Sequence, residues 1–344
     1  MAGNDSEEVG AHVTQHRPTI HEVAKAAGVS ISSVSRALNG NTSNPEMVAR
    51  VKAAVAEVGY VPSAVAQSLK TRQTGQIAFA MEDIGNAAYL AMVREIEPVL
   101  REVGYRLLLH ATGAEVDDEI EVLESLAQNY VDGLVLCPIR VTDRHIEALR
   151  DTPVPVVVIG LLPDDVPVDN VRADSRLGAR MAVQHLHARG ARRIAFVNGP
   201  ADTVPGHARF HGYRAGLEAV GLPYDEELVR FADFQVSAGH DAAQEIVART
   251  DVDAIFGAND LIAIGAMHAL REAGLSVPDD VRVVGMDDTT LAQTSFPTLT
   301  SVSLGSRERG RVAAEMLLAR LSGDGSEPAR VTVPPTLSVR ESST

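Results

Sequence analysis

The fold of this chain is decided near its start, where residues 18–40 read PTIHEVAKAAGVSISSVSRALNG. Apolar residues recur there at helical spacing in two short groups that meet at Gly28, which predicts two helices joined by a tight turn. Thr19 with Glu22 three residues later is a capping box for the first helix, and Ser30 is a suitable N-cap for the second. The stretch therefore predicts a helix-turn-helix.

A third helix is predicted over about residues 45–58, because it would open with Pro, which is favoured at the first helical position. Three short helices make a domain of the size that binds DNA, with the second helix in the major groove. The exposed face of that helix carries Ile31, Ser32 and Arg36, and the Arg36 guanidinium can donate two hydrogen bonds to N7 and O6 of a guanine. A helical hairpin with a solvated polar face would show the same pattern. Short donors suited to phosphate oxygens lie nearby: Ser30, Ser33, Ser35 and Asn39.

The next stretch, YVPSAVAQSLKTRQTGQ, contains Pro62 and Ser63, which open a helical segment over residues 64–70. This segment is too short to form a stable helix alone in water, so we expect it to become ordered on binding. Its apolar side chains can then enter the minor groove as a wedge and bend the duplex. A plain interdomain linker is the other interpretation.

Charge is distributed unevenly along the chain, although the total of −15 taken alone argues against a nucleic-acid partner. Residues 17–75 hold seven basic and three acidic side chains, a balance of +4, and they include every lysine of the chain. Residues 76–344 hold 24 basic and 40 acidic side chains, a balance of −16, and residues 1–16 contribute −3. This asymmetry indicates a polyanion-binding module near the start of the chain.

The rest of the chain alternates short apolar runs with amphipathic helical segments, as in QIAFAM followed by AYLAMVREIEPVLREVGY. Runs that are apolar throughout indicate strands buried on both faces, and hence parallel sheets with helices on each side. Because the pattern occurs twice, we expect an α/β fold with two doubly wound lobes. The expected lobes cover about residues 76–162 with 304–332, and about residues 172–298 with 334–344.

A cleft between two such lobes places residues at the carboxyl ends of the strands around a ligand. Arg209, which is expected to precede the helix that follows the Asn198 strand, adds a guanidinium. Carboxylates, amides and a guanidinium suit a polyhydroxylated ligand, because each sugar hydroxyl both donates and accepts hydrogen bonds. Helix or turn capping is the alternative role for several of these residues. The strand-end candidates are Glu82, Asp83, Gly160, Asn198, Gly199, Asn259, Asp260, Asp287 and Asp288.

The motif VAKAAGVSISSVSRALNG, followed by GYVPSAVAQSL, resembles the lactose-repressor/galactose-repressor family of bacterial transcription regulators, and the resemblance covers nearly the whole chain from Pro18. It implies a ligand-responsive regulator, a repressor in most members, that binds a pseudo-palindromic operator as a homodimer and a sugar or sugar derivative as effector. The implied domains are a disordered tail (1–17), a three-helix DNA-binding domain (18–61), a hinge helix and linker (62–75), and an effector domain of periplasmic-binding-protein type (76–344).

The resemblance also assigns roles to individual residues. Ile31, Ser32 and Arg36 match the base-reading positions, and Leu69 matches the residue that enters the minor groove. Met47 stands where most members have Thr, which removes one phosphate contact. The other implied DNA contacts are Thr19, Ser30, Ser35, Asn39, Ser63 and Ala66, to which we add Ser33 and Lys70 from the basic segment. The implied effector contacts are Arg209, Asn259 and Asp287, with Phe234 stacking on the ligand and with Glu82 and Asp83 as looser matches, of which we single out Asp83.

The sequence lacks the residues that an enzymatic, cofactor-binding or metal-binding function would need. The sequence contains no dinucleotide-binding, P-loop or serine-hydrolase motif, and no paired base and nucleophile, so we expect neither an enzyme nor a cofactor. His207 and His211 have chelating spacing but no evident third ligand, so we expect no metal site. A sugar-binding protein without a regulatory role would share the lobes but lack the basic head.

Compartment and assembly are constrained by what the sequence lacks. No apolar run is long enough to span a membrane, and residues 1–17 have no hydrophobic signal region, so we expect a cytoplasmic protein. The single cysteine, Cys137, excludes an intramolecular disulfide and reads as a small buried hydrophobe. Because no leucine heptad closes the sequence, a coiled-coil tetramer lacks its basis and a dimer is expected.

Overall fold

The computed structural model describes residues 18–40, 42–61 and 73–344 and divides into two compact units, Met1–Gln73 and Thr74–Thr344. We call the described part of the first unit the head and the second unit the body. The tail predicted at 1–17 and the hinge helix, with its proposed contacts Ser63, Ala66, Leu69 and Lys70, lie outside the described residues.

The head is a three-helix domain with the boundaries expected from its caps. Thr19 donates its backbone N–H to the Glu22 carboxylate at 2.7 Å, which completes the predicted capping box. Gly28 ends the first helix in the left-handed conformation, with a φ of 63°, which a glycine adopts without strain. The helices are α1 (Ile20–Ala27), α2 (Ile31–Leu38) and α3 (Pro45–Val58), and Val23, Val34 and Val51 form the centre of their core.

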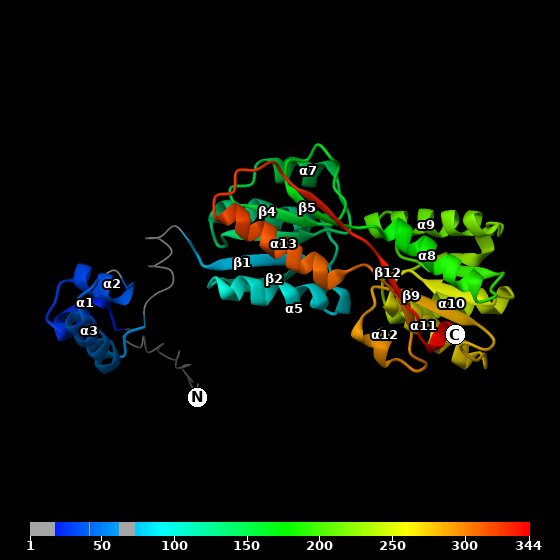
Figure 1. Cartoon of the computed structure of the whole chain (residues 1–344), viewed down its shortest axis with the longest axis horizontal. Helices are drawn as coiled ribbons and strands as arrows, with labels where there is room; N and C mark the ends of the chain where they lie inside the picture. Colours follow the sequence, from blue (N-terminus) through cyan, green and yellow to red (C-terminus); the bar gives the residue numbers. More distant parts are fainter. Residues whose placement is uncertain (1–17, 41, 62–72) are drawn as a thin grey trace, which may run out of the picture. The chain divides into compact units, whose positions relative to one another are not determined.

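The first lobe of the body is a six-stranded parallel sheet in the order β11-β5-β4-β3-β1-β2. Helices α5 and α13 pack on one face, around Met92, Ile96 and Leu317, while α6 and α7 cover the other (Figure 1). The strands are β1 (Gln76–Met81), β2 (Arg106–Ala111), β3 (Gly133–Cys137), β4 (Val156–Ile159), β5 (Asp169–Ala173) and β11 (Arg330–Val333). The helices are α5 (Ala87–Glu102), α6 (Val116–Ser125), α7 (Asp143–Arg150) and α13 (Ser306–Leu321).

The second lobe repeats this architecture with the order β12-β10-β9-β8-β6-β7, in which β12 is antiparallel to β10. Helices α8 and α9 pack together on one face, and α10 and α11 on the other. The strands are β6 (Ile194–Asn198), β7 (Val229–Phe231), β8 (Ala254–Gly257), β9 (Arg282–Met286), β10 (Thr300–Ser303) and β12 (Thr336–Ser338). The helices are α8 (Ser175–Ala188), α9 (Val204–Val220), α10 (Val236–Arg249), α11 (Asp260–Glu272) and α12 (Thr290–Thr294).

The lobes are built from interleaved segments, because the chain passes between them after β5, after β10 and after β11. The sequence pattern ends the first segment of lobe one near residue 162, whereas β5 extends it to Ala173. The sequence of β5, DNVRA, contains no apolar run, so the pattern did not indicate a strand there. Its polar side chains can be accommodated in the sheet because they are paired. Asp169 binds Arg320 at 2.7 Å, and the Asn170 amide donates to the Val158 carbonyl at 2.9 Å.

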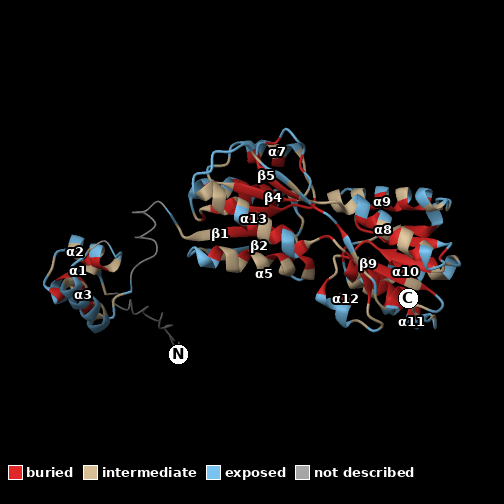
Figure 2. Cartoon of the chain, in the orientation of Figure 1, coloured by how far each residue is buried: buried red, intermediate tan, exposed pale blue. Residues whose placement is uncertain are grey.

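Strand β2 differs from the expectation that apolar runs mark strands buried on both faces. It is the edge of its sheet, and Leu108 and Leu109 are 38% and 41% exposed. The central strands of both sheets are buried as predicted (Figure 2). A buried run and a run at an uncovered edge therefore have the same sequence signature.

Candidate functional site

A cavity lies between the two lobes of the body, at the carboxyl ends of strands from both sheets. It encloses about 860 Å³, open solvent at its mouth included. Apolar side chains from both lobes form most of its wall, among them Met92, Ile139, Val204 and Leu304. Six of its lining residues are charged or carry an amide: Glu82, Asn86, Arg209, Asn259, Asp287 and Arg309.

Arg209 lies within α9 and not before it, contrary to the expectation, because the helix already begins at Val204. Its side chain projects into the cavity and is held on three sides. Its guanidinium donates to the Ala258 carbonyl at 2.9 Å, lies 3.6 Å from an Asp287 carboxylate oxygen, and stacks over the Phe234 ring at 5.5 Å from the centroid. The Nε atom is buried and has no hydrogen-bond partner. Three of the predicted effector residues are therefore brought together, and the Nε–H of the guanidinium is left without a protein partner.

Asn259 lines the same cavity and also caps a helix. Its side-chain oxygen accepts from the Ile262 N–H at 2.8 Å at the start of α11, and its amide nitrogen lies 3.4 Å from the Phe234 carbonyl. The capping alternative raised by the sequence is therefore correct, and it coexists with a place in the cavity wall. The cap fixes the side chain, so a ligand would meet a preset amide.

Asp287 and Asp288 follow β9 in left-handed backbone conformations, with φ values of 102° and 52°. Such conformations are uncommon outside glycine and are tolerated best by Asn and Asp. The turn separates the two side chains: Asp287 lines the cavity, whereas Asp288 forms an ion pair with Arg340 and accepts from the Ser338 hydroxyl at 2.8 Å. Asp288 is thus bound to β12 and the chain after it, outside the cavity.

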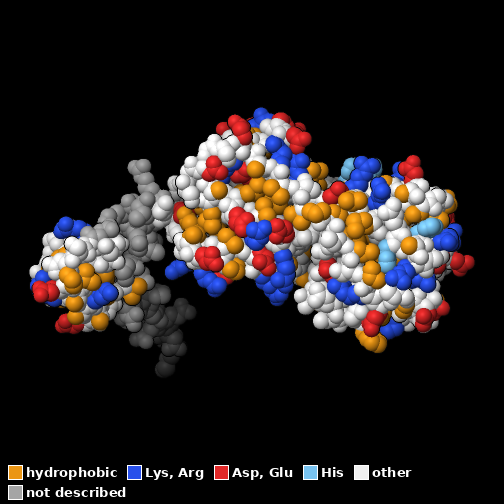
Figure 3. Space-filling model, viewed as in Figure 1, with side chains coloured by type: hydrophobic (Ala, Val, Ile, Leu, Met, Phe, Trp, Pro, Cys, Tyr) orange, Lys and Arg blue, Asp and Glu red, His pale blue; other side chains and the backbone are white. Residues whose placement is uncertain are grey.

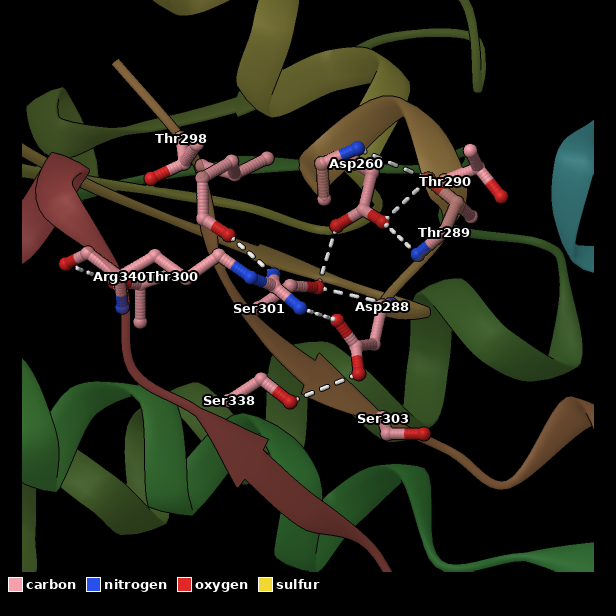
Figure 4. Close-up of polar contacts among 12 residues, drawn as sticks. Asp260, Asp288, Thr289, Thr290, Thr298, Thr300, Ser301, Ser303, Ser338 and Arg340 are labelled. Carbon is pink, nitrogen blue, oxygen red and sulfur yellow. Dashed lines mark hydrogen bonds and ion pairs between the residues drawn. The ribbon is translucent and has the colours of Figure 1, made fainter. Parts of the chain in front are cut away.

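Asp260 holds this turn in place through hydrogen bonds to the residues around it (Figure 4). Its carboxylate accepts hydrogen bonds from the Thr289 N–H at 2.7 Å, the Thr289 hydroxyl at 2.8 Å and the Ser301 hydroxyl at 2.5 Å. Ser301 in turn accepts from the Asp288 N–H at 3.0 Å. A strand-end candidate of the sequence is therefore a buried anchor for the turn that presents Asp287.

Burial dominates the electrostatics of the carboxyl groups around the cavity. It raises the pKa of Asp260 to about 7, with the nearby Asp287 charge adding to the effect. It also raises the pKa of Asp287, against the opposing influence of Arg209, and the pKa of Glu82, against a hydrogen bond from Tyr89. All three carboxyl groups therefore hold protons more tightly than a solvated carboxyl does.

Asp83 does not line the cavity, contrary to its predicted effector role. Its carboxylate accepts from the Gly85 N–H at 2.7 Å and from the Gln235 amide of the second lobe at 3.3 Å. The cavity is lined instead by the preceding residue, Glu82, whose carboxylate accepts from the Tyr89 hydroxyl at 3.2 Å. Successive residues after a strand point in opposite directions, so a slip of one position exchanges their roles.

The contact between Asp83 and Gln235 is one of several that join the lobes beside the cavity. Arg140 of lobe one binds Asp202 of lobe two at 2.7 Å. The Val204 N–H at the start of α9 donates to the Ile139 carbonyl at 2.8 Å. These contacts form a rim that must separate if the lobes open.

Two lining residues that the sequence did not single out are Tyr89 and Arg309. Tyr89 is buried in α5, and Arg309 lies in the first turns of α13, directly after the chain returns from lobe two. A charged residue among the buried positions of a helix is the signal that would have found Arg309. It was obscured by the other three arginines of SRERGRVAAEMLLARL, each of which has an acidic partner.

In the head, the predicted base-reading residues lie together on the outer face of α2. Ile31, Ser32 and Arg36 are all exposed, and Ile31 is 40% exposed although it is aliphatic. Arg36 reaches back to the Ser33 hydroxyl at 3.5 Å. The structure therefore presents an apolar side chain, a hydroxyl and a guanidinium on one surface, as contact with base edges requires.

The predicted phosphate contacts surround this face. Thr19 and Ser30 are exposed at the N-caps of α1 and α2, where backbone N–H groups favour anions. Asn39 is exposed at the end of α2, and its amide donates to the Ser35 carbonyl at 2.7 Å. Ser33 and Ser35 are half-buried, and Ser33 lies 2.9 Å from the Ser30 hydroxyl.

Comparison with known proteins agrees with both halves of this description. Residues 19–63 match a family model described as bacterial regulatory proteins, lacI family, and residues 183–343 match a periplasmic binding protein-like domain. The HTH-type transcriptional regulator CelR of Thermobifida fusca is 38% identical over 338 residues, with 95% of this chain and 99% of CelR covered. The ribose operon repressor of Escherichia coli K12 is 35% identical, with 94% and 99% covered.

The chain belongs to the lacI family of bacterial regulatory proteins. Among solved structures, the CelR–cellobiose complex has a TM-score of 0.72 at 36% identity and covers 95% of this chain and 100% of that one. The lac repressor dimer bound to operator and the anti-inducer ONPF has a TM-score of 0.85 at 27% identity, with coverages of 95% and 99%. The family membership and the fold predicted from the sequence are confirmed, and the chain is a DNA-binding transcriptional regulator.

Membrane-spanning helices and metal sites can be looked for directly in the described residues. No helix in the described part of the chain combines the length and the apolar character that crossing a bilayer requires. Across residues 18–40, 42–61 and 73–344, His, Cys, Asp and Glu side chains form no group of three that could hold a metal ion. His207 and His211 lie 3.1 Å apart through their Nε2 atoms.

Replacing Asp260 with Asn should remove a pH dependence of stability. Because the folded-state pKa of Asp260, about 7, lies above the ordinary value, the folded protein keeps a proton that the unfolded chain has already released. The contribution of this group to stability should therefore fall as pH rises from about 4 to about 7, with a slope of at most about 1.4 kcal/mol per pH unit. Urea unfolding followed by circular dichroism, at about pH 5.5 and 7.5, measures the slope. The exposed Asp251→Asn variant is the control, and an unchanged slope in Asp260→Asn contradicts the assignment.

Proposed function

We propose that this regulator is a repressor whose operator binding is controlled by a sugar or sugar derivative bound in the cavity between the lobes. The observation that carries the proposal is the convergence of Arg209, Asn259, Asp287 and Phe234 on one buried site. A guanidinium, an amide and a carboxyl can each bond to a hydroxyl, and the aromatic ring packs on the C–H face of a sugar. This class of ligand is supported by cellobiose in the CelR complex and by ribose bound to a lacI-family regulator from Enterococcus faecium, which has a TM-score of 0.70 at 26% identity.

The head would read the operator through α2. In this proposal Arg36, Ile31 and Ser32 contact base edges in the major groove, and Arg36 recognises a guanine. The phosphate contacts are Thr19, Ser30, Ser33, Ser35 and Asn39. The hinge residues Ser63, Ala66, Leu69 and Lys70, outside the described residues, would complete the interface in the minor groove.

Coupling of ligand binding to operator binding needs a firm connection between the hinge and the body. Asp132 provides one: its carboxylate accepts from the Thr74 N–H at 2.7 Å, the Thr74 hydroxyl at 3.0 Å and the Gly75 N–H at 2.9 Å. The segment that follows the hinge is therefore fixed to the first lobe directly before β1. Movement of the first lobe against the second would displace the hinge, and a ligand that prefers one arrangement shifts the balance of operator binding.

We also propose that the regulator acts as a homodimer, so that two heads read the two halves of a pseudo-palindrome. The edge strand β2 with exposed Leu108 and Leu109 is the surface that supports this, because an uncovered apolar edge favours association. Hydrophobic side chains gather on the displayed face of the first lobe (Figure 3). The lac repressor dimer, to which the chain is structurally similar, agrees with this state.

An enzymatic role is not proposed. Cys137 is the thiol that lines the cavity, and burial raises its pKa to about 12, so it is protonated at neutral pH. The described residues that line the cavity include no histidine to serve as a base. A sugar-binding protein without a regulatory role does not account for the DNA-binding head.

Arg36→Ala should weaken operator binding about 10- to 100-fold, the equivalent of about 1–3 kcal/mol, and relax selectivity at one base pair. Fluorescence anisotropy with operator and scrambled duplexes measures both effects. Arg50→Ala removes the same charge from an exposed position on α3 and should change the affinity for the two duplexes by similar factors. An equal loss on scrambled DNA for Arg36→Ala would refute its base-reading role.

Asp287→Asn should leave operator affinity unchanged and reduce ligand affinity by about tenfold or more, because an acceptor at the cavity becomes partly a donor. Asn is chosen because it tolerates the left-handed backbone of this position. Calorimetric titration with a ligand identified by thermal shift gives the affinity. Asp233→Asn, an exposed neighbour of Phe234, is the matched control. Wild-type ligand affinity in Asp287→Asn removes this residue from the site.

Leu109→Asp should convert the dimer to a monomer in sedimentation velocity at micromolar concentration, because it places a charge on the proposed interface. Operator affinity should fall with it, since the two half-sites would no longer be bound together. Leu177→Asp, a leucine of similar exposure on α8, should stay dimeric. A dimeric Leu109→Asp protein would show that β2 is not the contact.

A further inference from the structure

Arg309 introduces a second guanidinium into the cavity. It comes from the first lobe, whereas Arg209 comes from the second lobe. It lies in α13, lines the cavity and is 8% exposed. One helical turn of α13 packs tightly on α5 beside it, because a side chain at Gly310 would meet the Met92 backbone at 2.7 Å. The Arg309 side chain is therefore directed by a rigid contact between two helices.

The guanidinium of Arg309 is poorly satisfied by the protein. Within the described residues its hydrogen bond goes to the Ser306 hydroxyl at 3.1 Å, and its buried Nε has no partner. No carboxylate of the described chain lies within 4.0 Å of it in an ion pair, unlike the exposed arginines 307 and 311 of the same helix. A buried charge without an ion pair is unfavourable, and an anionic group of a ligand would supply the missing partner.

Neither carboxyl group of the cavity forms an ion pair with Arg309, although the Asp287 charge acts on it from a longer distance. Asp287 lies against Arg209 at 3.6 Å, and Glu82 accepts from the Tyr89 hydroxyl at 3.2 Å. Burial raises the pKa of both carboxyl groups, whereas an arginine stays charged at neutral pH even where burial lowers its pKa. The cavity therefore carries an excess of positive charge whenever either carboxyl group is protonated.

We propose that the effector carries an anionic group, a carboxylate or a phosphate ester, which binds Arg309 while its hydroxyl groups bind the Arg209, Asn259 and Asp287 cluster. The ligand class is then a sugar acid or a sugar phosphate. The inference rests on the proposed function, because it assumes that the effector occupies this cavity. Arginine suits the role, since its planar fork donates two parallel hydrogen bonds to a carboxylate or phosphate.

The test compares acids with their neutral counterparts in the full-length protein. Glucose, gluconate, glucuronate and glucose 6-phosphate form one series, and cellobiose and cellobionate form a second. Thermal shift and calorimetric titration give the ranking, and the carboxylate and phosphate members distinguish the two anion sources. We expect at least one anionic member to bind about tenfold or more tightly than its neutral counterpart.

Two variants assign the effect to the residue. Arg309→Met should lose about tenfold or more in affinity for the anion and less than about threefold for the neutral sugar, and Arg309→Lys should recover part of the loss. The unliganded Arg309→Met protein should melt at a higher temperature than wild type, because a buried charge that has no ion pair is removed. Arg307→Met is the control, since Arg307 is exposed and pairs with Glu95 at 3.2 Å.

Neutral sugars that bind wild type as tightly as the acids, or an Arg309→Met variant that keeps the preference for acids, would overturn the inference. Failure of every acid to bind would overturn it as well. These outcomes are distinguishable from failure of the proposed function, which is tested by operator binding. A protein that binds operator and responds to a neutral sugar keeps the proposed function and loses only the anionic ligand.

Discussion

The site depends on one buried carboxylate. Asp260 accepts three hydrogen bonds from Thr289 and Ser301, and these bonds hold the left-handed turn at Asp287 and Asp288 in place. Without that anchor the turn would have to keep two non-glycine residues in an unfavourable backbone conformation by itself. The anchored turn presents Asp287 to the cavity and directs Asp288 to Arg340. The ligand site and the junction with β12 therefore depend on the same hydrogen bonds.

The location of the cavity follows from topology. In each lobe the strands around the site are parallel, so their carboxyl ends meet at one edge, and the interleaved chain makes the two edges face each other. Strand β10, which precedes one crossing between the lobes, is bonded to Asp260 through Ser301, and β12, which follows another crossing, is bonded to Asp288 through Ser338. Movement of one lobe against the other can therefore alter the contacts that surround the ligand. Asp132 connects the first lobe to the segment that follows the hinge.

Much of the fold and part of the site could be predicted from the sequence, because local signals agree with the fold. Caps at Thr19 and Ser30 and the glycine at Gly28 set the helix boundaries of the head. Strand ends located Asn259 and Asp287 near one another, and the resemblance to the family added Arg209. What could not be predicted depends on side-chain direction and on contacts between distant segments. The exit angle of the chain from β1 decides whether Glu82 or Asp83 faces the cavity, and only the packing of α13 on α5 separates Arg309 from its exposed neighbours.

The distribution of charge separates the DNA-binding head from the ligand-binding body. The head belongs to the segment with a balance of +4, and the body carries −16, so attraction to DNA is confined to the head and depends on salt. The central claim is that the cavity and the operator are coupled. Its most direct test measures operator affinity with and without the ligand that most raises the melting temperature, and ligand affinity with and without operator. We expect both affinities to change by the same factor, of about fivefold or more. Operator affinity that is unchanged at saturating ligand would contradict the coupling.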